Sequence, residues 1–409
     1  MAKTLVLGSS ESTPVPFLRG ILTRSLQDAG LSFNQAYELS STVREDLSDT
    51  AEITTEKLRE KVIKRLKKEH SERVIERYRV PLHPHAPLLV RYEDGETIPF
   101  SRGYHLRYLE AISLPHDEAL SVTTKMYDHL MAKQTSEVSA KHLGELTYRC
   151  LYQDQGFGPA VARRYLLWTQ FLRSGRPLVL LIGGTAGCGK STIATELANR
   201  LDIVRMQSTD GLREVMRMML PERLVPALHT SSFRAWEALP ESGRNTDRDT
   251  VLAAGFRTQA ELLAVPCEAV IQRAIRERVS MILEGVHVHP LLLDRIPEGS
   301  DAIVVPILLA TLKPDQLRAR IRGRGNKVPQ RRSERYLDNF DAIWRLQSYL
   351  LSEADKAKIT IIPNEDKEKV IQEVMRTTIG YISREFSPDP NEVFKCDLED
   401  SSEPDKEIF

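Results

Sequence analysis

Residues 177–192 read PLVLLIGGTAGCGKST, and this stretch decides the fold of the central part of the chain. The apolar run 177–182 has the composition of a buried β-strand, and residues 192–201 (TIATELANRL) have helical composition and periodicity. The glycine-rich segment between them satisfies GxxxxGK[ST] and consists of Gly184, Thr185, Ala186, Gly187, Cys188, Gly189, Lys190 and Ser191. A loop of this type between a strand and a helix predicts a P-loop in an α/β domain.

The chemistry of this loop predicts that ATP and Mg²⁺ are the cofactors. Its glycines let the chain curl so that backbone N–H groups converge on phosphate oxygens, and the following helix presents its positive N-terminal end. We expect Lys190 to bridge the β- and γ-phosphates and Ser191 to bind Mg²⁺, with Thr192 in the same nucleotide site.

Four further apolar runs alternate with helical stretches and lie at residues 202–207, 279–286, 302–310 and 358–363. Strands separated by helices predict a parallel sheet with helices on both faces. We therefore expect an α/β P-loop kinase domain over residues 176–386. Its ligands should gather at the carboxyl edge of the sheet.

The second run ends in Ser208-Thr209-Asp210-Gly211. In many small-molecule kinases a carboxylate after this strand receives the proton of the acceptor hydroxyl or holds Mg²⁺ through water, and Asp210 is our candidate for both roles. The alternative is that Asp210 caps the helix that follows. The third run ends in Glu284, a carboxylate that is costly to bury unless it faces a cation, so Glu284 is a second candidate for the metal site.

Two other loop residues carry weaker signals. His287 follows the third run and could contact an anionic substrate, although an ordinary loop histidine is equally consistent with the sequence. Asn364 follows the last strand, where a backbone turn can pack on the adenine ring. Asn364 is also a good helix cap.

Arginine is concentrated in the segment KPDQLRARIRGRGNKVPQRRSERYLDNF at residues 313–340. We interpret it as a mobile lid that closes over the nucleotide, neutralises charge on the transferred phosphoryl group and excludes water. Arg331 and Arg335 are the catalytic candidates within it. RNA binding is the alternative, but the run lacks interleaved aromatic residues.

An internal repeat occupies the first 170 residues. PFLRG at residues 16–20 recurs as PFSRG at residues 99–103, an offset of 83 residues that grows slightly farther along the chain. Two copies of one small, mainly helical domain, at residues 1–79 and 88–171, are the simplest interpretation.

The second copy resembles the ATP-cone, a small regulatory nucleotide-binding module, because it keeps Arg91, Asp94-Gly95 and Phe100. The first copy has neither the basic residue nor Asp-Gly. Alternatively, both copies are dimerisation or spacer domains without a ligand. Association through these cone-like domains would make the protein a homo-oligomer.

Composition excludes several classes of protein. Lys and Arg number 57, as do Asp and Glu, so no global field attracts nucleic acid or an anionic membrane. No apolar stretch is long enough to span a membrane. The cysteines are scattered without metal-like spacing, so we expect a cytoplasmic protein with reduced thiols. The acidic tail at residues 387–409 is expected to be disordered.

Most of residues 88–386 resemble the 2-phosphoglycerate kinase family. The resemblance is carried by GGTAGCGKST (183–192), STDGLREVMR (208–217), LHTSSFRAW (228–236), ILEGVHVHP (282–290) and RYLDNF (335–340). It implies transfer of the γ-phosphoryl group of ATP to the 3-hydroxyl of 2-phosphoglycerate, giving 2,3-bisphosphoglycerate. Such a small anionic substrate requires fixed cations, and the expected contacts are Asp210, Arg213, Arg217 and His287.

Two other functions remain consistent with the sequence. One is a nucleotide-sensing regulatory or scaffold protein whose P-loop binds nucleotide without transferring phosphate. The other is a kinase that acts on RNA ends or on nucleotides.

Overall fold

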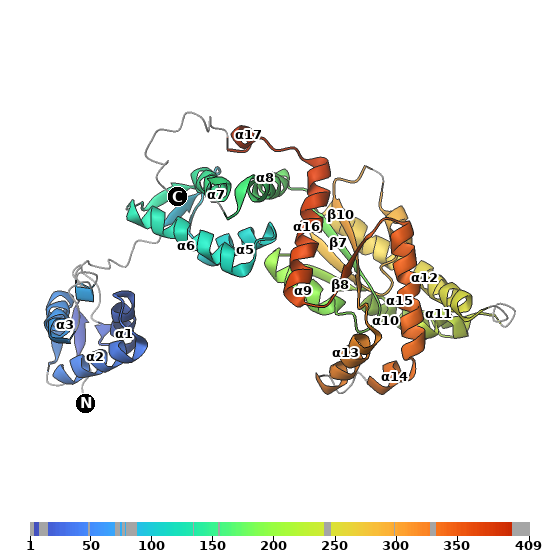
Figure 1. Cartoon of the computed structure of the whole chain (residues 1–409), viewed down its shortest axis with the longest axis horizontal. Helices are drawn as coiled ribbons and strands as arrows, with labels where there is room; N and C mark the ends of the chain where they lie inside the picture. The colour runs from blue at the N-terminus through green and yellow to red at the C-terminus, as the bar shows by residue number, and fades with distance from the viewer. Residues whose placement is uncertain are drawn as a thin grey trace. The chain divides into compact units, whose positions relative to one another are not determined.

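The computed structural model describes residues 4–7, 15–47, 50–69, 74–75, 78, 88–133, 135–153, 156–240, 247–297, 299–327 and 333–394 (Figure 1). The chain forms two compact units, Met1–Leu88 and Leu89–Phe409. The second unit contains both the second sequence repeat and the predicted P-loop domain. No helix within the described ranges has the length and apolar content that a bilayer span requires.

The first unit is a three-stranded sheet covered by helices. Strand β1 (Leu5–Leu7) pairs antiparallel with β2 (Val15–Pro16) and parallel with β3 (Glu52–Thr54). Helices α1 (Arg19–Asp28), α2 (Phe33–Asp46) and α3 (Thr55–Glu69) accompany the sheet and supply a core that includes Leu26, Val43 and Leu66.

The second unit begins with a sheet of the same topology. Strand β4 (Leu89–Arg91) pairs antiparallel with β5 (Thr97–Pro99) and parallel with β6 (Glu137–Ser139). A tight turn at Asp94-Gly95 joins β4 to β5, with Gly95 at φ +88°. Helices α5 (Arg102–Ala111), α6 (His116–Ala132), α7 (Ala140–Gln153) and α8 (Gly158–Ser174) follow the strands. The two repeats detected in the sequence thus share one strand order and one set of pairings.

A five-stranded parallel sheet organises the rest of the second unit, and each of its strands overlaps a run predicted from the sequence. The strands are β7 (Leu178–Gly183), β8 (Arg205–Ser208), β9 (Met281–Gly285), β10 (Ile303–Ala310) and β11 (Thr360–Pro363), in the order β11-β10-β7-β9-β8. The P-loop strand β7 is central and fully buried, which explains its continuous apolar run. The α/β fold predicted for this part of the chain is therefore confirmed.

Helices cover both faces of this sheet (Figure 1). Helices α12 (Arg248–Arg276) and α15 (Phe340–Lys356) pack on one face, and α9 (Lys190–Arg200) and α16 (Lys367–Glu385) pack on the other. The remaining elements are α10 (Thr209–Met219), α11 (Pro226–His229), η1 (Ser232–Ala238), η3 (Pro290–Arg295), α13 (Pro314–Lys327), α14 (Ser333–Asp338) and α17 (Pro390–Phe394).

The predicted disorder of the acidic tail is wrong for residues 387–394. Helix α17 forms there, and the side chain of Phe394 is fully buried, with its ring 5.8 Å from that of Tyr148 and close to Gly144. One large aromatic side chain that finds a pocket overrides the polar composition around it. Residues 395–409 lie outside the described part of the chain.

Candidate active site

The glycine-rich loop has a shape that only glycine permits at two positions. Gly184 has φ +138° and Gly189 has φ +91°, conformations that side-chain-bearing residues rarely adopt. A Cβ atom at Gly184 would lie 2.3 Å from the carbonyl oxygen of Leu309, and one at Gly189 would lie 2.4 Å from Nδ2 of Asn364. The loop is therefore fitted against the ends of β10 and β11 as well as curled around its own centre.

Lys190 opens helix α9 and points back across the loop. Its Nζ donates to the carbonyl oxygen of Thr185 at 2.8 Å. A neutral carbonyl is a weak partner for an ammonium group compared with a phosphate, so this contact holds Lys190 inside the loop in an orientation from which it can be released to a triphosphate.

Asn364 hydrogen-bonds to the glycine-rich loop and helps to fix its shape. Its side chain is buried, and its Nδ2 donates to the carbonyl oxygen of Cys188 at 2.7 Å, while its backbone N–H donates to Ala310 at 2.7 Å. The side-chain amide of Asn364 therefore shapes the phosphate loop. The packing of the backbone turn at Asn364 on the adenine ring stays a prediction.

Ser191 and Glu284 meet at the opposite side of the loop. Ser191 lies in the first turn of α9, which follows β7 and the loop, and Glu284 lies near the end of β9. The two residues share one edge of the sheet because β9 is the direct neighbour of β7. Ser191 Oγ donates to Glu284 Oε1 at 2.9 Å, and the Glu284 carboxylate is buried. A hydroxyl and a carboxylate side by side beside a phosphate loop are a donor set that fits Mg²⁺, which prefers oxygen ligands and retains several waters.

A cavity of about 200 Å³ opens above this edge of the sheet. It brings together residues from the P-loop, the ends of β8 and β9, helix α10, the start of η1, and the two helices of the predicted lid segment, α13 and α14. The cavity is lined by Ala186, Lys190, Ser191, Ser208, Asp210, Arg213, Ser231, Ser232, Phe233, Glu284, Gly285, Val286, Ile321, Ser333 and Tyr336.

Asp210 lies in the first turn of α10 with its side chain 69% exposed at the cavity. The cap of this helix is Ser208, whose Oγ accepts from the backbone N–H of Gly211 at 3.0 Å. The capping role considered for Asp210 is thus filled by another residue. Its carboxylate faces the cavity with only a loose contact, 3.8 Å, to Nη2 of Arg213.

The two arginines of α10 have different surroundings. Arg213 is 16% exposed, lines the cavity, and donates from Nη1 to the carbonyl oxygen of Thr230 at 2.9 Å. Arg217 instead pairs with Glu214 at 2.8 Å and does not line the cavity. Of the two arginines predicted to bind the substrate together, only Arg213 lines this cavity.

The lid helices reach the same cavity. In α14, Arg335 Nη2 donates to Ser231 Oγ at 2.6 Å, and the ring of Tyr336 lies 5.7 Å from that of Phe233. These contacts dock the lid onto the loop before η1. The other catalytic candidate of this segment, Arg331, lies outside the described residues.

His287 does not reach the cavity as the sequence interpretation expected. It is buried, Nε2 hydrogen-bonds Gln259 Oε1 at 2.8 Å, and Nδ1 hydrogen-bonds Thr209 Oγ1 at 3.2 Å. Burial lowers the pKa of His287 to about 3, so the ring is neutral near pH 7 and cannot attract an anion by charge. The difference from the prediction arises from tertiary packing, because the His287 ring stacks on the ring of Phe256 instead of turning outward.

Several residues of the site were not found by sequence reasoning. Ser231 and Ser232 line the cavity. Gln259 and Gln347 do not line it, but they hydrogen-bond to Thr230 and Thr311 next to it. Serine and glutamine are common on surfaces and in loops, so no local pattern separates these four from others. Only their position in LHTSSFRAW, one of the segments that carry the family resemblance, could have drawn attention to the serines.

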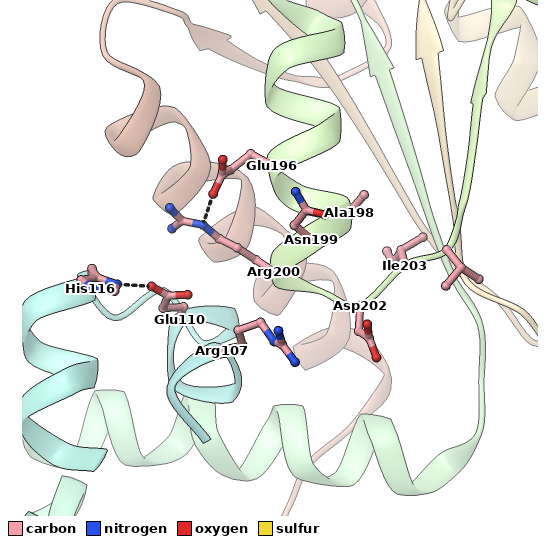
Figure 2. Close-up of a pocket in the computed structure, with 10 residues that line it drawn as sticks. Arg107, Glu110, His116, Glu196, Ala198, Asn199, Arg200, Asp202 and Ile203 are labelled. Carbon is pink, nitrogen blue, oxygen red and sulfur yellow. Dashed lines mark hydrogen bonds and ion pairs between the residues drawn. The ribbon is translucent and has the colours of Figure 1, made fainter. Parts of the chain in front are cut away.

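A larger cavity, of about 610 Å³, lies at the other end of α9 (Figure 2). It is lined by residues of the second repeat and of α9, and their charges largely satisfy one another. His116 contacts Glu110 at 2.7 Å, and Arg200 contacts Glu196 at 3.1 Å and Glu368 at 2.7 Å. Because α9 is about 16 Å long, this cavity is remote from Lys190 and takes no part in phosphate binding there.

No protein-family model matches the chain. Among curated proteins, 290 residues are 35% identical to the 2-phosphoglycerate kinase of Pyrococcus horikoshii, covering 70% of this chain and 93% of that protein. The enzyme of the same name from Thermococcus kodakarensis is 36% identical over 279 residues, covering 68% and 92% of the two chains. Solved structures of proteins from Chloroflexus aurantiacus and Eubacterium ventriosum align with 49% and 51% of the chain at TM-scores of 0.29 and 0.28, values that carry no inference.

Proposed function

The chain belongs to the 2-phosphoglycerate kinase family, and from this membership we propose that it is an ATP-dependent kinase acting on 2-phosphoglycerate. The γ-phosphoryl group of ATP is transferred to the 3-hydroxyl of the acid, and the products are 2,3-bisphosphoglycerate and ADP. One observation carries the proposal: Lys190, Glu284, Asp210 and Arg213 line a single cavity next to the P-loop.

The donor end of the cavity is the P-loop. The backbone N–H groups of residues 184–191 and the N-terminus of α9 hold the triphosphate, and Lys190 leaves the carbonyl of Thr185 to contact the transferred phosphoryl group. Mg²⁺ bound at Ser191 and Glu284 would neutralise phosphate charge. Their contact at 2.9 Å supports this metal site.

The acceptor end is formed by α10 and the loop before η1. Asp210 accepts the proton of the attacking hydroxyl, since it is the carboxylate that is exposed within the cavity. Arg213 binds the anionic groups of the acid, and the hydroxyls of Ser231 and Ser232 add hydrogen bonds. Arg335 ties the lid to Ser231, so binding of the acid and closure of the lid involve the same loop.

The reaction is tested by supplying the purified chain with ATP, Mg²⁺ and a panel of small acids: 2-phosphoglycerate, 3-phosphoglycerate, glycerate and phosphoenolpyruvate. We expect release of ADP that depends on 2-phosphoglycerate, together with a new bisphosphorylated product detectable by ³¹P NMR. Phosphoenolpyruvate, which lacks the 3-hydroxyl, is the matched blank. Absence of acid-dependent ADP release with the whole panel would contradict the kinase assignment.

Arg213→Met and Arg217→Met form a matched pair for the acceptor site. Each removes one guanidinium from the same helix, but only Arg213 lines the cavity. We expect Arg213→Met to raise KM for 2-phosphoglycerate by about 10- to 100-fold, the usual effect of losing hydrogen bonds to a charged group. Arg217→Met should leave KM within about 2-fold of wild type, because its partner is the exposed Glu214. Equal effects in initial-rate measurements would show that the cavity is misassigned.

We further propose a cytoplasmic location, nucleotide binding in the second repeat and self-association through the repeats. Among the described residues, the thiols of Cys188 and Cys267 are buried and form no disulfide, which supports a reducing compartment. In the second repeat, the Asp94-Gly95 turn and the ring of Phe100, 6.0 Å from that of Tyr127, support a preserved cone-like domain.

A further inference from the structure

Two glutamines are buried behind the catalytic cavity, one in each of the long helices that cover the same face of the sheet. Gln259 in α12 has an exposed fraction of 0%, and Gln347 in α15 has one of 3%. Buried amide groups are retained only when their donors and acceptors are paired. Both glutamines are paired with backbone or side chains that lead directly to the cavity.

Gln259 holds the loop that forms the acceptor end. Its Nε2 donates to the carbonyl oxygens of Ala227 and Thr230, the latter at 3.2 Å. The carbonyl of Thr230 is also the group to which Arg213 Nη1 donates. The next residue, Ser231, receives the hydrogen bond from the lid residue Arg335. The Gln259 amide group thus positions the Thr230-Ser231 backbone, to which Arg213 and the lid residue Arg335 both bind.

The other end of the same amide leads to Asp210. Because Gln259 presents its NH₂ group to two carbonyls, its oxygen must accept from His287, so His287 carries its proton on Nε2. The unprotonated Nδ1 of His287 then accepts from the hydroxyl of Thr209 at 3.2 Å. Thr209 is fully buried and immediately precedes Asp210. The chain of hydrogen bonds therefore fixes the first turn of α10.

Gln347 performs the corresponding task at the donor end. Its Oε1 accepts from the backbone N–H of Thr311 at 3.1 Å and from Thr185 Oγ1 at 3.5 Å, and its Nε2 donates to the carbonyl oxygen of Thr311 at 2.9 Å. Thr185 supplies the carbonyl that holds Lys190, and Thr311 Oγ1 accepts from Arg320 of the lid helix α13.

We infer that Gln259 and Gln347 are positioning residues with separate tasks: Gln259 orients the groups that bind the acceptor, and Gln347 orients the groups that bind ATP. The inference rests on the proposed kinase reaction for the identity of the two ligands. Glutamine suits both places because it supplies a donor and an acceptor without a charge, whereas a buried carboxylate would oppose the carbonyls of Thr230 and Thr311.

The matched variants Gln259→Met and Gln347→Met test the division. Methionine preserves the approximate volume of glutamine but removes its hydrogen bonds. We expect Gln259→Met to raise KM for 2-phosphoglycerate by about 10-fold with KM for ATP within about 2-fold of wild type, and Gln347→Met to show the opposite selectivity. Initial rates are measured with each substrate varied at saturation of the other.

Two outcomes would overturn the inference. In the first, both variants raise both Michaelis constants alike. In the second, melting temperatures fall while both constants stay at wild-type values, as expected of glutamines that only stabilise the fold. Gln259→Asn and Gln347→Asn, which keep an uncharged amide but shorten its reach, are the second pair if a methionine variant does not fold, and the same selectivity is expected of them.

Failure of the proposed reaction is distinguished by wild-type protein assayed in parallel. If wild type does not use the acid, the function is wrong and the positioning roles are judged without substrate. Amide hydrogen exchange should then rise at residues 209–211 and 227–233 in Gln259→Met, and at residues 185–190 and 311–312 in Gln347→Met. Exchange that rises uniformly in both variants, or in neither, would refute the separate tasks.

Discussion

Replacing Lys190 with alanine is expected to lower kcat by about 10³-fold or more while the protein remains folded. Lys190 is the ammonium group that is held inside the P-loop, where the transferred phosphoryl group would lie. Its Nζ contacts only the carbonyl oxygen of Thr185 among the interactions described for it. Removing it leaves one carbonyl that water can satisfy, so little stability is lost, but charge that develops during transfer loses a fixed cation.

The matched control is Lys367→Ala. Lys367 is also a lysine in the first turn of a helix, α16, and its Nζ contacts Glu196 at 2.6 Å on the exposed side of α9. The Lys367→Ala substitution changes the net charge by the same amount as Lys190→Ala, but away from the cavity. The kcat of this variant should stay within about 2-fold of wild type, because exposed ion pairs contribute little. Measurements of kcat and of the melting temperature for both variants decide whether Lys190 takes part in phosphoryl transfer. A Lys190→Ala protein that keeps more than about a tenth of wild-type kcat would place the transfer chemistry elsewhere.

The sheet and the contact between Ser191 and Glu284 could be predicted because they depend on local signals. The runs that became β7, β9 and β10 are continuous and apolar, as expected of strands buried on both faces. The meeting of Ser191 and Glu284 follows from parallel strands that end at one edge. No side-chain detail was needed for these conclusions.

The walls of the cavity could not be predicted, because they depend on which helix faces which loop. Gln259 lies within a 29-residue helix, where a glutamine ordinarily faces solvent, and it is buried only because α11 and His287 pack over it. The burial of Phe394 likewise requires the small residue Gly144 on a helix some 250 residues away in sequence. Composition and periodicity contain no information about such distant pairings.

Asp210→Asn is the second large effect that we expect, a fall in kcat of about 10³-fold with an almost unchanged melting temperature. Asparagine has the same shape as aspartate but cannot accept the proton of the acceptor hydroxyl. Stability should change little because Ser208, not Asp210, caps α10, and the Asp210 side chain is mostly exposed. A small loss of stability is still expected, because a negative charge in the first turn of a helix is favourable.

The comparison variant is Asp247→Ala, which removes an aspartate that does cap a helix. The side chain of Asp247 accepts from the backbone N–H groups of Asp249 and Thr250 at the start of α12. Its loss should lower the melting temperature and leave kcat unchanged, the reverse of the pattern expected for Asp210→Asn.

If Asp210→Asn destabilises the protein but keeps its turnover per folded molecule, then Asp210 is structural and another group must take the proton. Ser208, the last residue of β8, also lines the cavity, and its hydroxyl is engaged with Gly211. A proton-accepting role for Asp210 is therefore the one that this wall of the cavity supports.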